Sequence, residues 1–249
     1  MDVEALLRRI GYEGARDPNA DVLQALHRAF VLSVPFENLD IHLGRPIVLD
    51  EAALFDKIVK RRRGGFCYEM NGLFAALLRA LGFDVTLLSA RVVGTDGKAG
   101  PEFDHLVLLV PLSERRLADV GFGDVFVHPL RLDASGEQPD DKGPCRITRD
   151  DGKRAVERRT PEGAWKTLYF FTETPRRLDE FAGMCRYHQT SPDSPFTQKR
   201  FTTKPTGTGQ VTLSEHTLIV TERGTRTERE LCGEEEYRSV LRERFGLVV

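Results

Sequence analysis

The most informative stretch of the chain is RGGFCYEMNGLF, residues 63–74. Gly64 and Gly65 allow a tight or positive-φ turn directly before a helix. Cys67 then falls at the start of that helix, where unpaired backbone N–H groups and the helix dipole favour a negative charge on sulfur. Cys67 is therefore a candidate nucleophile. The competing interpretation is that it is a small buried apolar residue, as most lone cysteines are.

Around this stretch, the first third of the chain predicts helices. Apolar residues that share a helical face mark four of them: Leu6, Leu7 and Ile10 before a stop at Gly11; Leu23, Leu26 and Phe30; Leu54 and Ile58 after an N-cap at Asp50; and Phe74, Leu77, Leu78 and Leu81 before Gly82. Between the second and third helices lies VPFENL, residues 34–39, which reads as an apolar loop interrupted by proline. The triplet at 61–63, three arginines, could attract a phosphate but is more simply a solvated helix end.

From Phe83 to about Arg186 the pattern favours strands. Apolar or alternating runs occur at 85–92, 105–110, 116–120 and 125–127, separated by turn clusters such as GTDG at 94–97. Successive short strands without intervening helices indicate an antiparallel sheet or barrel.

The last part, from about Tyr187, begins with a loop rich in Ser, Pro and Thr. Two strands are expected at 211–213 and 217–221, and a closing helix at about 234–244, ending at Gly246. The alternating charges over 222–243 predict a solvated surface.

Composition narrows the class of protein. The chain has 249 residues, enough for a sizeable core, and a net charge of −2, which argues against a general binder of nucleic acid or anionic membranes. No basic and apolar leader opens it, and no apolar run reaches the 18 residues that span a bilayer, so a cytoplasmic protein with reduced thiols is expected. Its cysteines are too far apart for a zinc ribbon or a dithiol site: Cys67, Cys145, Cys185 and Cys232.

A thiolate nucleophile needs a base, and the base needs an orienting partner. His105 opens the most apolar predicted strand, and Asp119 lies in a later strand just before VGFG. Two buried polar residues on adjacent strands of one hairpin can meet across the sheet, which would give the order Cys67, His105, Asp119. The alternative is two independent core residues satisfied by the backbone. No other histidine has such a setting, and His27 is placed on the polar side of its helix.

Several segments together resemble the arylamine N-acetyltransferases. Residues 63–74 look like the active-site cysteine motif of that family, VPFENL at 34–39 like its upstream motif, and DVGFG at 119–123 like a third. Residues 187–196, YHQTSPDSPF, and the final Phe245-Gly246 also fit, so the likeness spans nearly the whole chain. Phe30 departs from the pattern, because family members often have a second histidine there.

The resemblance implies an α+β fold in three parts. A helical bundle, residues 1–83, carries the cysteine; an antiparallel β-barrel, residues 84–186, carries the histidine and the aspartate; and an α/β lid, residues 187–249, closes the cleft. The Cys-His-Asp arrangement is like that of cysteine proteases. The chain is at the short end for the family, and the resemblance does not assign which residues of the lid contact CoA.

The resemblance also implies the chemistry. Acetyl-CoA is the donor and co-substrate, with no permanently bound cofactor and no metal, and the acceptor is an arylamine, arylhydrazine or N-arylhydroxylamine. By carry-over, Cys67 takes the acyl group in a ping-pong reaction, His105 pairs with its thiolate, and Asp119 orients His105. A substrate and cofactor cleft is expected to be lined by Phe36, Asp104, Phe122 and Gly123.

Two other functions remain open from the sequence. An ansamycin-type amide synthase would share the fold and the three residues but use a carrier-bound polyketide. A transglutaminase-like thiol hydrolase shares the Cys, His, Asp order, although VPFENL and DVGFG argue against it. The expected partners are small molecules, without nucleic acid or membrane, and the sequence fixes neither the acceptor amine nor the oligomeric state.

Overall fold

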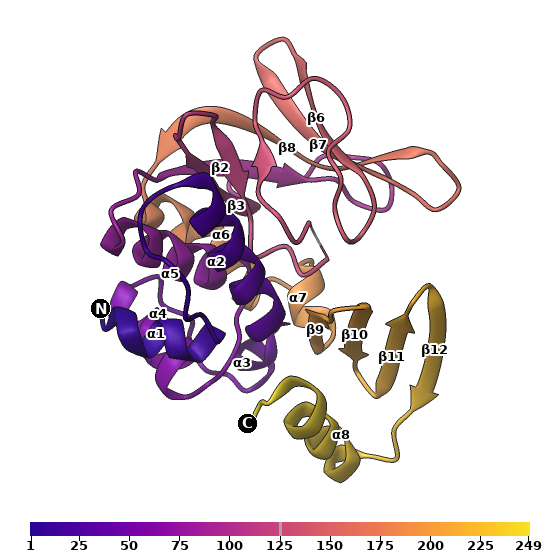
Figure 1. The fold of residues 1–249 in the computed structure, drawn as a ribbon. Coiled ribbons are helices and arrows are strands. Elements are labelled where there is room, and N and C mark those ends of the chain that lie inside the picture. The colour runs from indigo at the N-terminus through magenta and orange to yellow at the C-terminus, as the bar shows by residue number, and fades with distance from the viewer. Residues whose placement is uncertain (125) are drawn as a thin grey trace.

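The computed structural model describes residues 1–124 and 126–249 and shows an α+β fold. Helices from the first third of the chain, a strongly bent antiparallel sheet, and a second sheet covered by the last helix occupy separate regions, as Figure 1 shows. This architecture confirms the predicted fold class.

The predicted N-terminal helices are confirmed. They are α1 (Val3–Ile10), α2 (Ala20–Ser33), α4 (Glu51–Phe55), which continues as a π-helical turn η1 (Asp56–Lys60), and α5 (Cys67–Ala80). Asp2, Asn19 and Asp50 cap the first three through side-chain oxygens that accept backbone N–H groups. The expected loop at 34–39 is wrong in part, because it contains β1 (Phe36–Glu37) and the start of α3 (Leu39–His42). That short strand forms only because the C-terminal sheet supplies a partner far along the chain.

Seven strands form the central sheet: β2 (Thr86–Val92), β3 (His105–Val110), β4 (Arg116–Ala118), β5 (Leu130–Arg131), β6 (Cys145–Asp150), β7 (Lys153–Arg159) and β8 (Trp165–Arg176). Their order is β5-β4-β3-β2-β8-β7-β6, and every pair is antiparallel. The sheet curls into a nearly closed barrel around its own apolar core. Of the strand expected at 125–127, residue 125 lies outside the described residues, and Phe126 and Val127 form no strand.

The C-terminal part begins with helices. After the turn η2 (Leu178–Phe181) come α6 (Ala182–Thr190) and α7 (Pro195–Gln198). The loop expected from Tyr187 therefore starts only at Ser191, because Phe181, Cys185 and His188 share a buried helical face that the Ser-, Pro- and Thr-rich composition obscured. The boundary expected between residues 186 and 187 lies inside α6.

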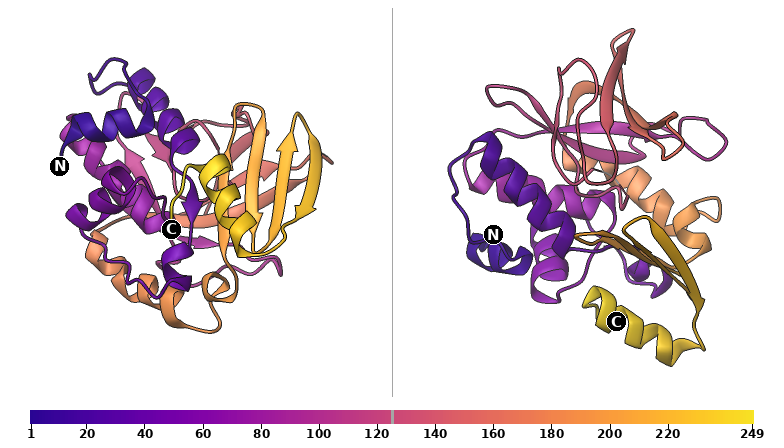
Figure 2. Two further views of the ribbon diagram at one scale, coloured as in Figure 1. Left: turned by 90° about the horizontal axis from the view of Figure 1, so that it is seen from below. Right: turned by 45° about the vertical axis from the view of Figure 1, so that its right-hand side comes forward.

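A five-stranded antiparallel sheet completes the fold. It contains β9 (Phe201–Pro205), β10 (Gly209–Ser214), β11 (Thr217–Glu222) and β12 (Thr225–Glu230), in the order β1-β9-β10-β11-β12. The helix α8 (Glu234–Val240) and the turn η3 (Leu241–Phe245) cover one face of this sheet, as both views in Figure 2 show. Because β1 is its edge strand, the sheet joins the N-terminal third of the chain to the C-terminal part.

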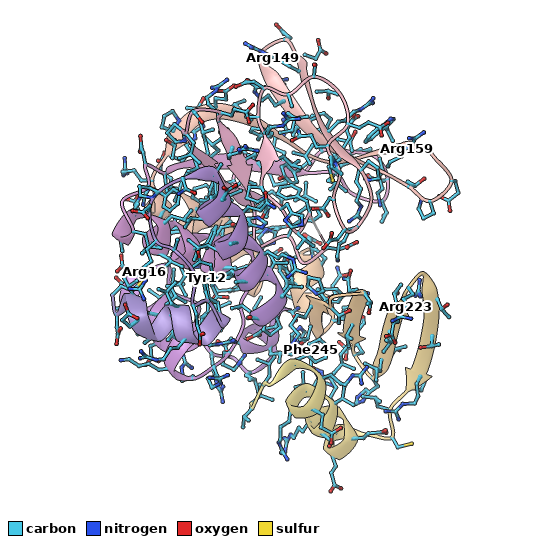
Figure 3. The ribbon with its side chains drawn as sticks, in the orientation of Figure 1. Tyr12, Arg16, Arg149, Arg159, Arg223 and Phe245 are labelled. Atoms are coloured by element: carbon cyan, nitrogen blue, oxygen red, sulfur yellow. The ribbon has the colours of Figure 1, made fainter. Side chains whose placement is uncertain are left out.

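The charged segment 222–243 lies largely on the surface. Every residue of β12 is exposed, and Arg223, labelled in Figure 3, lies at the turn before it on the outer edge of the molecule. The prediction of a solvated surface is confirmed for this strand. Because β12 is also an edge strand of its sheet, its charged side chains discourage pairing with another chain.

Candidate active site

Cys67 is the first residue of α5 and is almost wholly buried, with 4% of its surface exposed. The helix start is fixed by the Glu69 side chain, which turns back to accept the Phe66 backbone N–H at 3.1 Å. The thiol therefore lies at a rigid helix N-terminus, as the sequence predicts.

The turn before the cysteine is tight, but for another reason than the one expected. Neither Gly64 nor Gly65 has a positive φ, and the left-handed residue is Arg62, with φ 53°. The glycines are required by close approach: a Cβ on Gly64 would lie 2.0 Å from the carbonyl oxygen of Pro35. The turn thus packs directly on the VPFENL segment.

A buried ionic cluster supports this turn, which makes the interpretation of residues 61–63 as a solvated helix end wrong for Arg63. Its guanidinium is 2% exposed and lies 2.7 Å from Glu37 and 3.0 Å from Asp40. Lys57 lies 2.9 Å from Asp40 and 2.8 Å from Glu69. Burial of these charges is compensated by their pairing, so the cluster joins VPFENL, η1 and the start of α5 into one unit.

His105 and Asp119 are in direct contact. His105 Nε2 lies 2.7 Å from Asp119 Oδ2, and both side chains are buried. The other carboxylate oxygen accepts the Asn71 side-chain amide at 2.9 Å and the Gly121 N–H at 3.0 Å. Burial alone would raise the pKa of Asp119, but His105 and these donors hold it below its usual value. Asp119 is therefore an ionised partner for the imidazole.

Burial dominates the electrostatics of Cys67. It raises the pKa of the thiol well above its usual range, and Asp104, Cys185 and Asp119 raise it further, while the Leu106 N–H lowers it. The helix start alone does not outweigh this burial. A thiolate at this position needs a neighbouring cation.

The DVGFG segment lies against the start of α5. A Cβ on Gly121 would be 2.8 Å from the Cα of Cys67, so only glycine fits there. The Val120 N–H donates to Asn71 Oδ1 at 2.9 Å, which fixes the segment to the same helix. This packing brings the loop that carries Asp119 next to the cysteine.

Cys67 and His105 open into one cavity of about 540 Å³. Phe36, Asp104 and Phe122, three of the predicted cleft residues, also line it. Gly123 does not: it lies behind Phe36, where an added Cβ would be 3.2 Å from that ring and from Thr203. The rest of the wall comes from the segment 92–101, from Gly121 and Pro195, and from four ring-bearing side chains, Tyr187, His188, Phe196 and Phe201.

Three residues near this site escaped the sequence reasoning. His27 is fully buried rather than on a polar face, and its spacing from Leu23 and Phe30 was the available signal, since all three share one helical face. Tyr169 packs its ring 5.3 Å from His105, and burial raises the pKa of its hydroxyl. His188 Nε2 lies 3.2 Å from Asp104 Oδ1, a contact between distant segments that no local pattern reveals.

Within 1–124 and 126–249, no His, Cys, Asp or Glu side chains gather in threes or more in a way that could hold a metal ion. In the same residues, every helix is too short or too polar to cross a membrane.

Comparison with known proteins gives concordant matches. Residues 19–249 match the family described as N-acetyltransferase. The arylamine N-acetyltransferase of Mycolicibacterium smegmatis is 44% identical over 206 residues, which cover 79% of this chain and 74% of the relative.

Solved structures agree. That of the arylamine N-acetyltransferase from Mycobacterium tuberculosis superposes with a TM-score of 0.92 at 35% identity, covering 99% of this chain and 94% of the other. The Mycobacterium marinum arylamine N-acetyltransferase, solved in complex with CoA, gives a TM-score of 0.92 at 32% identity, covering 99% and 93%.

Proposed function

The chain belongs to the arylamine N-acetyltransferase family of acyltransferases, and from that premise we propose that it moves an acetyl group from acetyl-CoA to aromatic amines and hydrazines through acetylated Cys67. The observation that carries the proposal is a buried thiol at a helix start that shares a cavity with a histidine held by a carboxylate at 2.7 Å. This is the arrangement of an activated nucleophile, its base and the group that orients the base.

In the first half-reaction, the thiol proton passes to His105 while sulfur attacks the thioester carbonyl carbon. Since the Asp119 carboxylate accepts from Nε2–H, the lone pair that takes the proton is on Nδ1. The tetrahedral intermediate expels CoA sulfur, which recovers the proton from His105. N–H groups at the start of α5, without partners inside the helix, are suited to the oxyanion.

The same groups serve the second half-reaction. The amine nitrogen attacks the carbonyl carbon of acetyl-Cys67, the carbon–sulfur bond breaks, and His105 relays the amine proton to the departing sulfur. Burial raises the pKa of the free Cys67 thiol, so the sulfur that departs in this step takes up the proton readily. Donor and acceptor occupy the site in turn, so ping-pong kinetics are expected.

The cavity favours a planar aromatic acceptor. Its wall carries the rings of Phe36, Phe122, Phe196 and Phe201, which suit edge and face contacts with an aryl group. Asp104 directly precedes His105 in the sequence and lines the same cavity. Its carboxylate is placed to accept a hydrogen bond from the bound amine or hydrazine.

The test is to incubate the enzyme with acetyl-CoA alone and to map the modified peptide by mass spectrometry. One acetyl group is expected on Cys67, with release of one CoA, followed by discharge when an aniline or a hydrazide is added. Cys185→Ser, which changes the other buried cysteine of this region, is the matched control and should still be acetylated. Folded enzyme that carries no acetyl group on Cys67 would refute the proposal.

A further inference from the structure

His27 is a buried histidine that the proposed reaction does not use. It lies on α2 with no exposed surface, between the loop after β4 and the segment at 126–127. The Asp119 backbone N–H donates to His27 Nε2 at 3.1 Å, and His27 Nδ1 lies 2.8 Å from the Val127 carbonyl oxygen. Both ring nitrogens are therefore engaged with main-chain groups, and one of these groups belongs to Asp119.

These two contacts determine the form of the ring. A backbone N–H can only donate, so Nε2 must offer its lone pair, and the ring proton must be on Nδ1, where it donates to the carbonyl. The imidazole is therefore neutral. Burial, which lowers the pKa of His27 to about 4, agrees with this assignment. Protonation would direct a second N–H at the Asp119 amide and break the contact.

The ring is also held by aromatic neighbours. It stacks on Phe126 with a centroid distance of 5.9 Å and an interplanar angle of 15°, and it meets the edge of Phe74 at 5.9 Å. Since Phe74 belongs to α5, the helix that carries Cys67, the histidine is fixed relative to the cysteine as well as to Asp119.

We propose that neutral His27 is a positioning residue that fixes the main chain of Asp119 and, through its carboxylate, the ring of His105. Asn71 of α5 holds the Asp119 side chain, at 2.9 Å, and His27 of α2 holds its backbone, so two helices set the carboxylate from two sides. The inference rests on the roles proposed above for Asp119 and His105. The proposal predicts that the reactivity of Cys67 depends on a hydrogen-bond acceptor at the position of His27 Nε2.

Three variants separate the two hydrogen bonds. His27→Phe keeps a flat ring but removes both. His27→Gln can place its amide oxygen near the position of Nε2 and accept the Asp119 N–H. His27→Asn is one bond shorter and reaches only the position of Nδ1, where it can donate to Val127.

Each variant is assayed for the single-turnover rate of Cys67 acetylation and for the pH profile of Cys67 alkylation by iodoacetamide, both per folded molecule. Because small displacements of catalytic groups are costly, the Phe and Asn variants should lose about tenfold or more in acetylation rate. Their alkylation profiles should also shift along the pH axis. The Gln variant should stay close to the wild type in both measurements, which a role in stability alone does not predict.

Val22→Ala is the matched control, because it removes buried volume from the same helix without touching a hydrogen bond of the site. It should lower stability and leave the rate and the profile per folded molecule unchanged. The proposal is overturned if the Asn variant matches the Gln variant, a comparison that holds even if the Phe variant does not fold.

The wild type separates this inference from the proposed function. A wild type that is not acetylated by acetyl-CoA contradicts the function, while the alkylation profiles of the variants still decide the role of His27. A wild type that is acetylated, beside variants with unaltered rates and profiles, contradicts only the role of His27.

Discussion

Cys67 combines two opposing influences on one sulfur atom. The start of α5 favours a thiolate, but burial raises the pKa of the thiol well above its usual range. A permanent thiolate would be costly there, and the proposed transfer of the thiol proton to His105 during attack on the thioester would avoid an isolated buried charge. In the proposed reaction, burial of the sulfur would limit the access of water to its acetyl group and so favour attack by the amine over hydrolysis.

His27 should make the folded protein sensitive to acid. The ordinary histidine pKa is about 6.5, and burial, opposed by Val127 and Asp119 and assisted by His128, lowers that of His27 to about 4. Between these values the unfolded chain binds a proton that the folded chain does not, so this contribution to stability is lost as the pH falls. From pH 7 to 4.5 the loss from this one group is about 2–3 kcal/mol.

Urea unfolding of the wild type and of His27→Gln at both pH values measures this contribution. Glutamine does not titrate, so the variant should lose about 2–3 kcal/mol less than the wild type between the two conditions. Identical losses would mean that His27 is not held neutral in the folded state.

At the scale of elements, helix α5 depends on a charge balance at its first turn. Lys57 is the cation that contacts Glu69, at 2.8 Å, and Glu69 in turn accepts the Phe66 N–H before the cysteine. Burial raises the pKa of Glu69, and Lys57 opposes that rise. The ionised carboxylate therefore depends chiefly on Lys57, with a smaller contribution from the Phe66 N–H.

Lys57→Met should cost about 3–5 kcal/mol in the free energy of unfolding, because it leaves a buried carboxylate without its cation. Glu69→Gln removes the charge but keeps an acceptor for Phe66, and it leaves Lys57 paired with Asp40 at 2.9 Å, so a loss of only about 1 kcal/mol is expected. Urea unfolding at neutral pH compares the two. Equal losses would show that the turn does not depend on this charge pair.

The elements also show how far sequence reasoning reaches. The end of α1 at Gly11, the start of α4 after Asp50 and both ends of α5 follow from capping residues and periodicity close at hand, and these were predicted. The strand β1 was missed because its partner, Thr203, is more than 150 positions away. Arg63 was wrongly predicted to be solvated for the same reason. Its ion-pair partners are Glu37 and Asp40, and no local spacing in the sequence connects them to it.

The candidate site divides along the same line. A glycine turn before a helix pointed to Cys67, and polar residues in predicted apolar strands pointed to His105 and Asp119, because each carries a local anomaly, although β4 ends one residue before Asp119. The pairing of Asp104 with His188 and the support of Asp119 by His27 are tertiary contacts with no such anomaly.

At the scale of the whole molecule, the cavity is assembled from all three regions of the fold. Helix α5 contributes Cys67, the barrel contributes His105, and the C-terminal sheet with α7 contributes Phe36, Phe196 and Phe201. No region contains the whole wall, so the acceptor pocket exists only while the regions stay joined. Asn38 connects the VPFENL segment to the residues around α7. Its side-chain N–H groups donate to the carbonyls of Phe196 and Lys199, and its oxygen accepts the Phe201 N–H.

Asn38→Ala should loosen the segment that closes the cavity. It removes three hydrogen bonds of 2.7–2.8 Å to partly buried main-chain groups, of which the Phe196 carbonyl keeps His42 Nε2 at 3.0 Å, so a loss of about 2 kcal/mol is expected. Since Phe196 and Phe201 line the acceptor pocket, KM for an aromatic amine should rise several-fold, while acetylation of Cys67 by acetyl-CoA alone changes less. Limited proteolysis should cut between residues 191 and 200 before the rest of the chain unfolds.

Gln198→Ala, which removes an exposed hydrogen bond of the same segment, is the matched control and should behave as the wild type. An Asn38→Ala protein with an unchanged KM and no early cleavage would show that the segment is held by its aromatic packing alone.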